Sequence, residues 1–160
     1  MFHHYGHPLI DRQEVTNYLP HREPMILVDR LLGIKGGTIV GELLIRPENP
    51  FVTDTGEMLL GGAIEHMAQS AGLGQAYKAA SMSGPRDASK TGKGEFGFIV
   101  NIRSLQYERL PRLGETLRTE ASTITQNGNH STMSFFCYVG EQLLVSCTMG
   151  LMGPKDQNTK

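Results

Sequence analysis

The chain has 160 residues, a formal net charge of −1 and 39% apolar residues. That length suits one domain with a sizeable core, and an ordinary apolar share excludes a disordered chain. A nucleic-acid binder needs a concentrated basic face, which this sequence does not offer.

Both ends of the chain are expected to be loosely held parts of a single domain that spans 1–160. Residues 1–10 lack the basic stretch and apolar run of a secretory signal, so we expect a cytoplasmic protein. His3, His4 and His7 lie in this segment, and residues 154–160 form the opposite tail. No carboxylate or cysteine stands in register with these histidines. We therefore interpret them as solvated rather than as a metal site.

The first third of the chain predicts a short helix and a hairpin. Asp11 can cap the helix, with Glu14 completing a capping box and Pro20 ending it. Residues 25–35 and 38–46 are rich in Ile, Leu and Val and flank Gly36-Gly37, which is typical of a hairpin turn.

The remainder of the chain predicts one long helix and a series of strands. The helix spans about 60–80, and its polar residues are too many for a membrane span. A loop follows at 81–94, and the strands cover 95–110, 115–125, 131–139 and 142–152. A single helix that is apolar almost all the way round must be wrapped, and only the sheet can do so. We predict an α+β domain with a curved antiparallel sheet around one central helix.

The two cysteines are expected to be free thiols. If Gly140-Glu141 is a two-residue turn, Cys137 faces Leu144 and Cys147 faces Ser134. The cysteines are then roughly 10 Å apart at the rise of a strand. A disulfide tolerates at most about 7 Å between Cα atoms, and free thiols suit a reducing compartment.

One stripe of the central helix differs from the rest of its surface. Glu65 and Gln69 stand there among small residues, which are Gly61, Gly62, Gly72 and Ala76. Glycine in a helix costs about 1 kcal/mol relative to alanine, so the stripe predicts close approach of backbone or ligand. Near the helix start, Gly61 and Gly62 also offer N–H groups that suit a carbonyl or an anion.

Titratable side chains on and near this helix are the candidate catalytic groups. A buried Glu65 must raise its pKa or find partners, and a pKa near neutrality serves general acid catalysis. The alternative is an ion pair with an arginine at a dimer interface. His66 points about 100° away on the helix, so we interpret it as a packing or hydrogen-bonded residue. His21 is interpreted as structural.

Two motifs resemble the 3-hydroxyacyl-acyl carrier protein dehydratases. Residues 19–30, LPHREPMILVDR, resemble the opening signature of that family, and residues 65–69, EHMAQ, resemble the E-x-x-A-Q of its central helix. The resemblance covers about 20–153 and implies a hotdog fold and a homodimer with two active sites at its interface. It implies a catalytic Glu65, a thioester carbonyl held by the N–H of Gly61 or Gly62, and loss of water across C2–C3.

The resemblance also implies the partner and the absence of a cofactor. The substrate is carried on the phosphopantetheine of an acyl carrier protein or on CoA, with no metal. Fatty acid or polyketide biosynthesis is the expected setting. In the family, the loop before the helix carries a G-H-F-P histidine, but the loop at 49–57 here has none. A divergent branch without this histidine includes members in aryl polyene pigment clusters. Asp54, His66 or a histidine of a partner subunit is then the candidate base.

Two other functions stay open besides the dehydratase. A hotdog thioesterase would use the helix carboxylate as nucleophile or to activate water, and needs no histidine. A non-catalytic acyl-binding subunit would pair with a complete dehydratase in a heterodimer.

The long strand at 95–110 is expected to pair with its symmetry mate, because few charges protect it. The acyl pocket is expected to be a narrow apolar tunnel lined by Phe96, Phe98 and the backbone of Gly97. These residues and Gln69 are expected to contact the substrate. The tunnel opens near the loop at 81–94, whose three cations, Arg86, Lys90 and Lys93, either steer an acidic carrier protein or are simply solvated.

Overall fold

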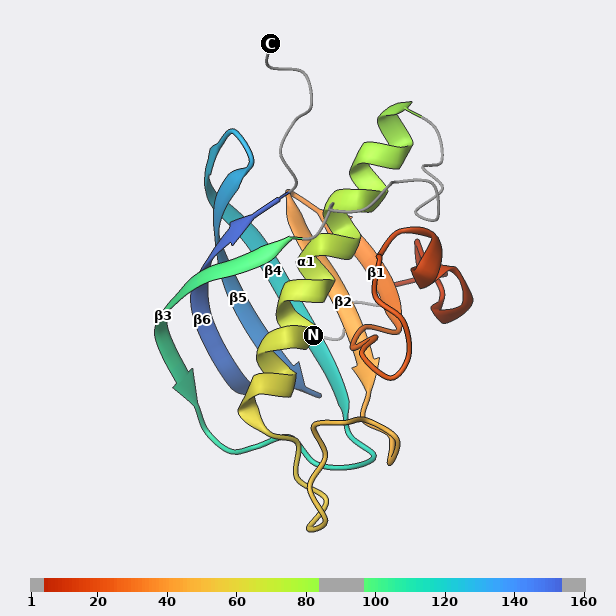
Figure 1. Cartoon of the computed structure of the whole chain (residues 1–160), viewed down its shortest axis with the longest axis vertical. Helices are drawn as coiled ribbons and strands as arrows, with labels where there is room; N and C mark the ends of the chain where they lie inside the picture. The colour runs from red at the N-terminus through yellow and green to blue at the C-terminus, as the bar shows by residue number, and fades with distance from the viewer. Residues whose placement is uncertain (1–4, 84–96, 154–160) are drawn as a thin grey trace.

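The computed structural model describes residues 5–83 and 97–153, and its architecture is a curved sheet that holds one long helix (Figure 1). The six strands form one antiparallel sheet in the order β1-β2-β4-β5-β6-β3. Their bounds are Arg30–Lys35, Thr38–Leu44, Phe98–Tyr107, Thr116–Asn127, His130–Val139 and Gln142–Met152, for β1 to β6. The helix α1 spans Leu60–Ser83, and a 3-10 helix η1 spans Arg12–Asn17. The predicted α+β hotdog fold is confirmed.

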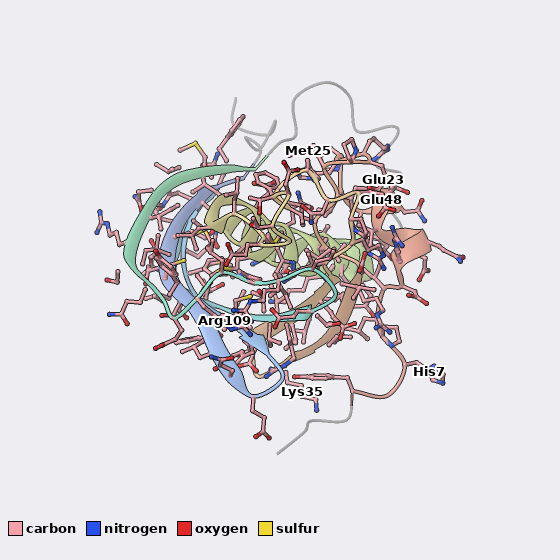
Figure 2. The ribbon with its side chains drawn as sticks, turned by 90° about the horizontal axis from the view of Figure 1, so that it is seen from below. His7, Glu23, Met25, Lys35, Glu48 and Arg109 are labelled. Atoms are coloured by element: carbon pink, nitrogen blue, oxygen red, sulfur yellow. The ribbon has the colours of Figure 1, made fainter. Side chains whose placement is uncertain are left out.

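The helix packs on the concave face of the sheet, and the core lies between them. Met67 and Leu73 of α1 are fully buried, as are Leu117 of β4 and Phe135 of β5. Seen from below, the sheet curves around the helix (Figure 2). The sheet encloses the helix as predicted, because a helix with apolar residues on most sides needs an enclosing surface.

Close contact between α1 and β2 requires a glycine in the strand. A Cβ atom on Gly41 would lie 2.3 Å from the Ser70 Oγ and 2.6 Å from the Ser70 Cβ. On the helix side, a Cβ on Gly74 would lie 2.5 Å from a methyl group of Ile39. These two glycines therefore allow the backbones of helix and strand to approach, which tightens the core.

Local signals placed the short elements correctly, with small differences in length. Asp11 and Glu14 form the predicted capping box, and η1 ends at Asn17, ahead of Pro20. Gly36 and Gly37 form the first hairpin turn with φ values of 56° and 83°. The link between β4 and β5 is shorter than predicted, because the two strands extend to Asn127 and His130.

The hairpin of β5 and β6 corrects the predicted cysteine register. Val139 pairs with Gln142 as predicted, but a bulge between Cys137 and Tyr138 shifts the strand by one residue. Cys137 therefore pairs with Val145 rather than Leu144, and Cys147 pairs with Phe135 rather than Ser134. Both thiols are free and buried, as expected. Burial raises the pKa of each thiol to about 11.

The segment 25–29 was predicted as the start of the first strand, and this is wrong. Strand β1 begins only at Arg30. The backbone N–H of Leu27 instead donates to the Oε1 of Gln69, at 2.7 Å, and the carbonyl of Met25 accepts from the Nε2 of the same side chain, at 2.9 Å. Because a helix side chain satisfies these groups, the segment crosses α1 instead of extending the sheet.

Strand β3 is an edge strand, and it begins at Phe98 rather than at residue 95. Phe98 is 62% exposed, and four further apolar side chains of the strand are also exposed, namely Val100, Ile102, Leu105 and Tyr107. A bulge between Arg103 and Gln106 bends the strand. An apolar edge of this length favours pairing with another chain.

In the part of the chain that the structure describes, no helix is long and apolar enough to cross a membrane.

Candidate active site

The carboxyl group of Glu65 is held by the next turn of its own helix. The Nε2 of Gln69 donates to the Oε1 of Glu65 at 2.8 Å. Gln69 is buried, whereas the Glu65 side chain is 29% exposed. The expectation that Glu65 finds polar partners is confirmed. A carboxyl group with a fixed orientation and access to solvent can exchange a proton with a small molecule.

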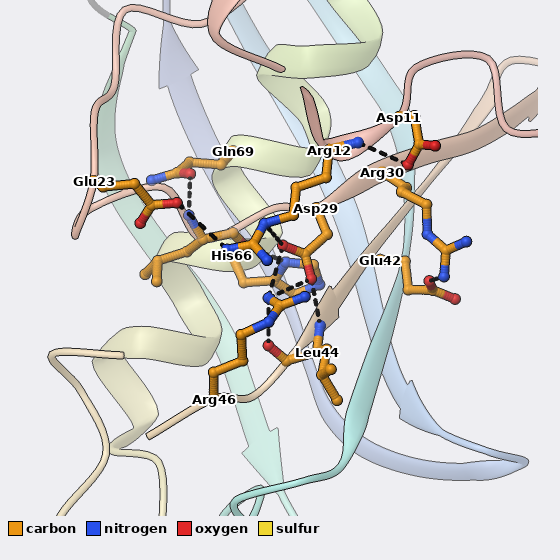
Figure 3. Close-up of polar contacts among 11 residues, drawn as sticks. Asp11, Arg12, Glu23, Asp29, Arg30, Glu42, Leu44, Arg46, His66 and Gln69 are labelled. Carbon is orange, nitrogen blue, oxygen red and sulfur yellow. Dashed lines mark hydrogen bonds and ion pairs between the residues drawn. The ribbon is translucent and has the colours of Figure 1, made fainter. Parts of the chain in front are cut away.

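Gln69 is the anchor of this region. Besides Glu65, its amide forms hydrogen bonds with the backbone of Met25 and Leu27. These three hydrogen bonds hold the Gln69 side chain in one position. Figure 3 shows Gln69 and His66 of the helix beside the segment that carries Asp29, to which both side chains bond at Leu27. Because Oε1 accepts and Nε2 donates twice, the amide has only one orientation that satisfies every partner.

His21 lies beside Glu65, which sequence reasoning did not anticipate. The Nε2 of His21 is 3.6 Å from the Oε1 of Glu65, and both side chains are 29% exposed. Partial burial lowers the pKa of His21, Glu65 opposes this effect, and Arg22 adds to it. The imidazole is therefore neutral at pH 7. The interpretation of His21 as a structural residue missed this pair, because the contact arises from the packing of the 19–27 segment against the helix.

His66 is a packed residue with one strong hydrogen bond, as the helical wheel indicated. Its ring is fully buried, and Nδ1–H donates to the carbonyl oxygen of Leu27 at 2.7 Å. Burial lowers the pKa of His66 to about 4. The ring has no exposed surface in the described chain, which disfavours contact with a substrate, and the assignment of His66 as the base stays a prediction.

Asp54 lies in an exposed turn ahead of the helix. The turn is closed by the N–H of Gly56, which donates to the carbonyl of Thr53 at 2.9 Å, and Gly56 has a φ of 82°. The side chains of Thr53 and Thr55 bond to each other at 2.9 Å. The backbone here forms a turn, in which an aspartate commonly stabilises the chain, so the residue type at position 54 also suits a turn residue.

The glycines at the start of α1 differ in their surroundings. A Cβ on Gly62 would lie 2.6 Å from the Cβ of Phe51, so the space beside Gly62 is filled by protein. Its N–H donates to the carbonyl of Leu59 at 2.9 Å. Gly61 is exposed, and its N–H lies in the first helical turn, where intrahelical acceptors are lacking. Gly61 is thus the better candidate to hold a thioester carbonyl.

The residues expected to line an acyl tunnel are not enclosed in a single chain. Gly97 is exposed, like Phe98 on the edge strand, so a tunnel at this place needs a second chain. Phe96 lies outside the described residues, as do the three cations of the preceding loop, Arg86, Lys90 and Lys93.

A small, solvent-open depression of about 50 Å³ lies between the 23–29 segment and β2, and its lining includes Ile26, Leu27 and Leu43. Asp29 is its polar centre and binds Arg46 at 2.9 Å and the N–H of Leu44 at 2.9 Å, with Arg12 at 3.5 Å (Figure 3). These contacts neutralise the aspartate. Neither Glu65 nor His21 lines the depression, so it is separate from the candidate site.

Comparisons with known proteins identify similar dehydratases. The model of the ApeP-like family, described as ApeP dehydratase, matches residues 13–160. The 3-hydroxyacyl-[acyl-carrier-protein] dehydratase FabZ of Chloroflexus aggregans is 29% identical over 117 residues, which are 70% of this chain and 74% of that protein.

Solved structures show the same fold. The dehydratase heterocomplex ApeI:P from Xenorhabdus doucetiae matches with a TM-score of 0.75 at 18% identity, over 89% of this chain and 91% of that chain. A hypothetical thioesterase with coenzyme A from Streptococcus pneumoniae matches with a TM-score of 0.53 at 16% identity, over 79% and 87% of the two chains.

Proposed function

The chain belongs to the ApeP-like dehydratase family, and from this premise we propose that it dehydrates 3-hydroxyacyl thioesters carried on an acyl carrier protein. The observation that carries the proposal is the partly exposed carboxyl of Glu65, oriented by Gln69 on the central helix. A general acid in this position can protonate a departing hydroxyl group.

The start of α1 supplies the second element of the reaction. A thioester carbonyl bound at the N–H of Gly61 lies one helical turn from Glu65, which is the separation of neighbours on a helix face. Partial positive charge at the helix start favours the oxygen as it becomes negative. The acyl chain then extends toward β3, where Phe98 and the backbone of Gly97 form one wall and a second chain forms the other.

The second chain is a copy of the same protein or another hotdog subunit. The exposed apolar edge of β3 supports pairing of either kind. One observation favours a heterodimer as a second candidate, because the similar ApeI:P structure is described as a heterocomplex of dehydratases. In that arrangement the chain binds the acyl group and its partner completes the chemistry.

A mass assay with matched variants tests the proposal. A 3-hydroxyacyl carrier protein is incubated with the protein, alone and together with a second hotdog subunit. Loss of one water supports the dehydratase, release of free acid indicates a thioesterase, and activity only with the partner supports the heterodimer.

Glu65→Gln keeps the shape of the side chain and should lower turnover by about 10²- to 10⁴-fold. Glu48→Gln is the control, because this exposed residue lies at the periphery (Figure 2). Normal turnover by a folded Glu65→Gln variant would contradict the proposed role.

A further inference from the structure

We propose that His21 is the catalytic base of this site, acting with Glu65 as a pair in place of the histidine that the loop at 49–57 lacks. The inference rests on the proposed dehydratase function and names the group that removes the proton from C2. It depends on the placement of the 19–27 segment across the helix.

The distance and exposure of the two side chains suit a shared substrate. The His21 Nε2 and the Glu65 Oε1 are 3.6 Å apart, and each side chain is 29% exposed. The Nδ1 atom of His21 is enclosed and has no hydrogen-bond partner among the described residues. Only Nε2 can therefore meet a substrate, and it does so next to the carboxyl group that would act as acid.

The backbone that carries His21 is fixed on both sides. The Arg22 guanidinium donates to the carbonyl oxygens of Leu19 at 3.0 Å and of His21 at 2.7 Å. The N–H of Met25 donates to the carbonyl of Arg22 at 2.9 Å. Gln69 then binds Met25 and Glu65 with the same amide group. One helix side chain thus holds both Glu65 and the segment that follows His21, which favours a constant distance between the two groups.

The charge state of His21 suits a base. Desolvation lowers its pKa, so the ring carries a lone pair at neutral pH. The other two candidates are less suitable, since Asp54 lies in an exposed turn and His66 is fully enclosed.

The reaction balances with these two groups alone. The Nε2 lone pair takes the proton from C2, and the C2–H electrons form the C2–C3 double bond as the C3–O bond breaks. The carboxyl of Glu65 gives its proton to the leaving hydroxyl, which departs as water. The products are an enoyl thioester, an imidazolium and a carboxylate. Transfer of the proton from Nε2 to Oε1 restores the starting state.

Turnover of a matched set of variants is the first test. His21→Asn keeps a polar group near the place of Nδ1 and removes Nε2, whereas His130→Asn changes a histidine at the β4–β5 turn. We expect His21→Asn to lower kcat by about 10²- to 10⁴-fold without a change in melting temperature. Added imidazole should restore part of the lost rate, because it supplies the missing base. His130→Asn should keep the wild-type rate.

Proton NMR of the histidine side chains is the second test and needs no substrate. Since Glu65 raises the pKa of His21, Glu65→Gln should lower that pKa further. This measurement also applies if His21→Asn and the alternative His21→Gln fail to fold.

The outcomes separate this inference from the proposed function. If the wild-type protein releases no water, alone or with a partner subunit, the proposed function fails and the inference fails with it. If the wild-type protein is active and His21→Asn is equally active, only the inference is overturned. Suppose that His21→Asn is slow and is not rescued by imidazole, and that Glu65→Gln leaves the pKa of His21 unchanged. His21 would then be a structural residue, and the inference would also be overturned.

Discussion

Acid should destabilise this protein through His66. The ring is fully buried, its Nδ1–H is bonded to Leu27, and its Nε2 has no hydrogen-bond partner among the described residues. Protonation would place a charge and an N–H without an acceptor in the core. The folded protein therefore resists protonation, while the unfolded chain accepts a proton at the ordinary pKa.

The magnitude follows from the two pKa values. The pKa of His66 falls from 6.5 in the unfolded chain to about 4 in the fold. Above pH 6.5 both states are neutral, so the residue has no effect on the pH dependence. Between pH 6.5 and about 4 only the unfolded chain binds the proton, so stability decreases as the pH falls. At about 1.4 kcal/mol for each pH unit, the free energy of unfolding should drop by about 3 kcal/mol.

Urea unfolding of the wild type and of His66→Asn at several pH values measures this effect. Asparagine keeps the donor to Leu27 and does not titrate, at a cost of about 1–3 kcal/mol near pH 7. From pH 7 to pH 4 we expect the wild type to lose about 3 kcal/mol relative to His66→Asn, so that its advantage disappears or reverses. His21 and Glu115 have lowered pKa values too, but they are present in both proteins and cancel. A difference that does not depend on pH would refute this account of His66.

Three further predictions concern the site, the core and the edge strand. Asp54→Asn should keep near wild-type turnover, because Asp54 lies in an exposed turn, and a loss as large as that of His21→Asn would identify it as the base instead. Gly41→Ala should lower the free energy of unfolding by about 1–3 kcal/mol, since the new Cβ meets Ser70, whereas Gly6→Ala has open space and serves as the control in thermal melts. The exposed apolar edge of β3 should be covered by a dimer contact, and light scattering that gives a monomeric mass at micromolar concentration would contradict this.

Local sequence signals determined the elements of this fold and their order. The capping box of Asp11 and Glu14, the Gly36-Gly37 turn and the Gly140-Glu141 turn each act over a few residues, so their geometry follows from nearby side chains. The central helix is apolar on most of its sides, so it required an enclosing sheet, and this requirement determined the architecture. The stripe of Glu65 and Gln69 followed from helical periodicity alone.

Only the tertiary structure decided how distant segments meet. The bulge at Cys137 and Tyr138 changed the strand register, and no turn signal encodes a bulge within a strand. Gln69 forms hydrogen bonds with the backbone of Met25 and Leu27. The segment that was predicted as a strand therefore crosses α1. That crossing placed His21 beside Glu65. Such a contact depends on the packing of a whole chain segment against a helix, and the spacing of the two residues in the sequence does not contain it.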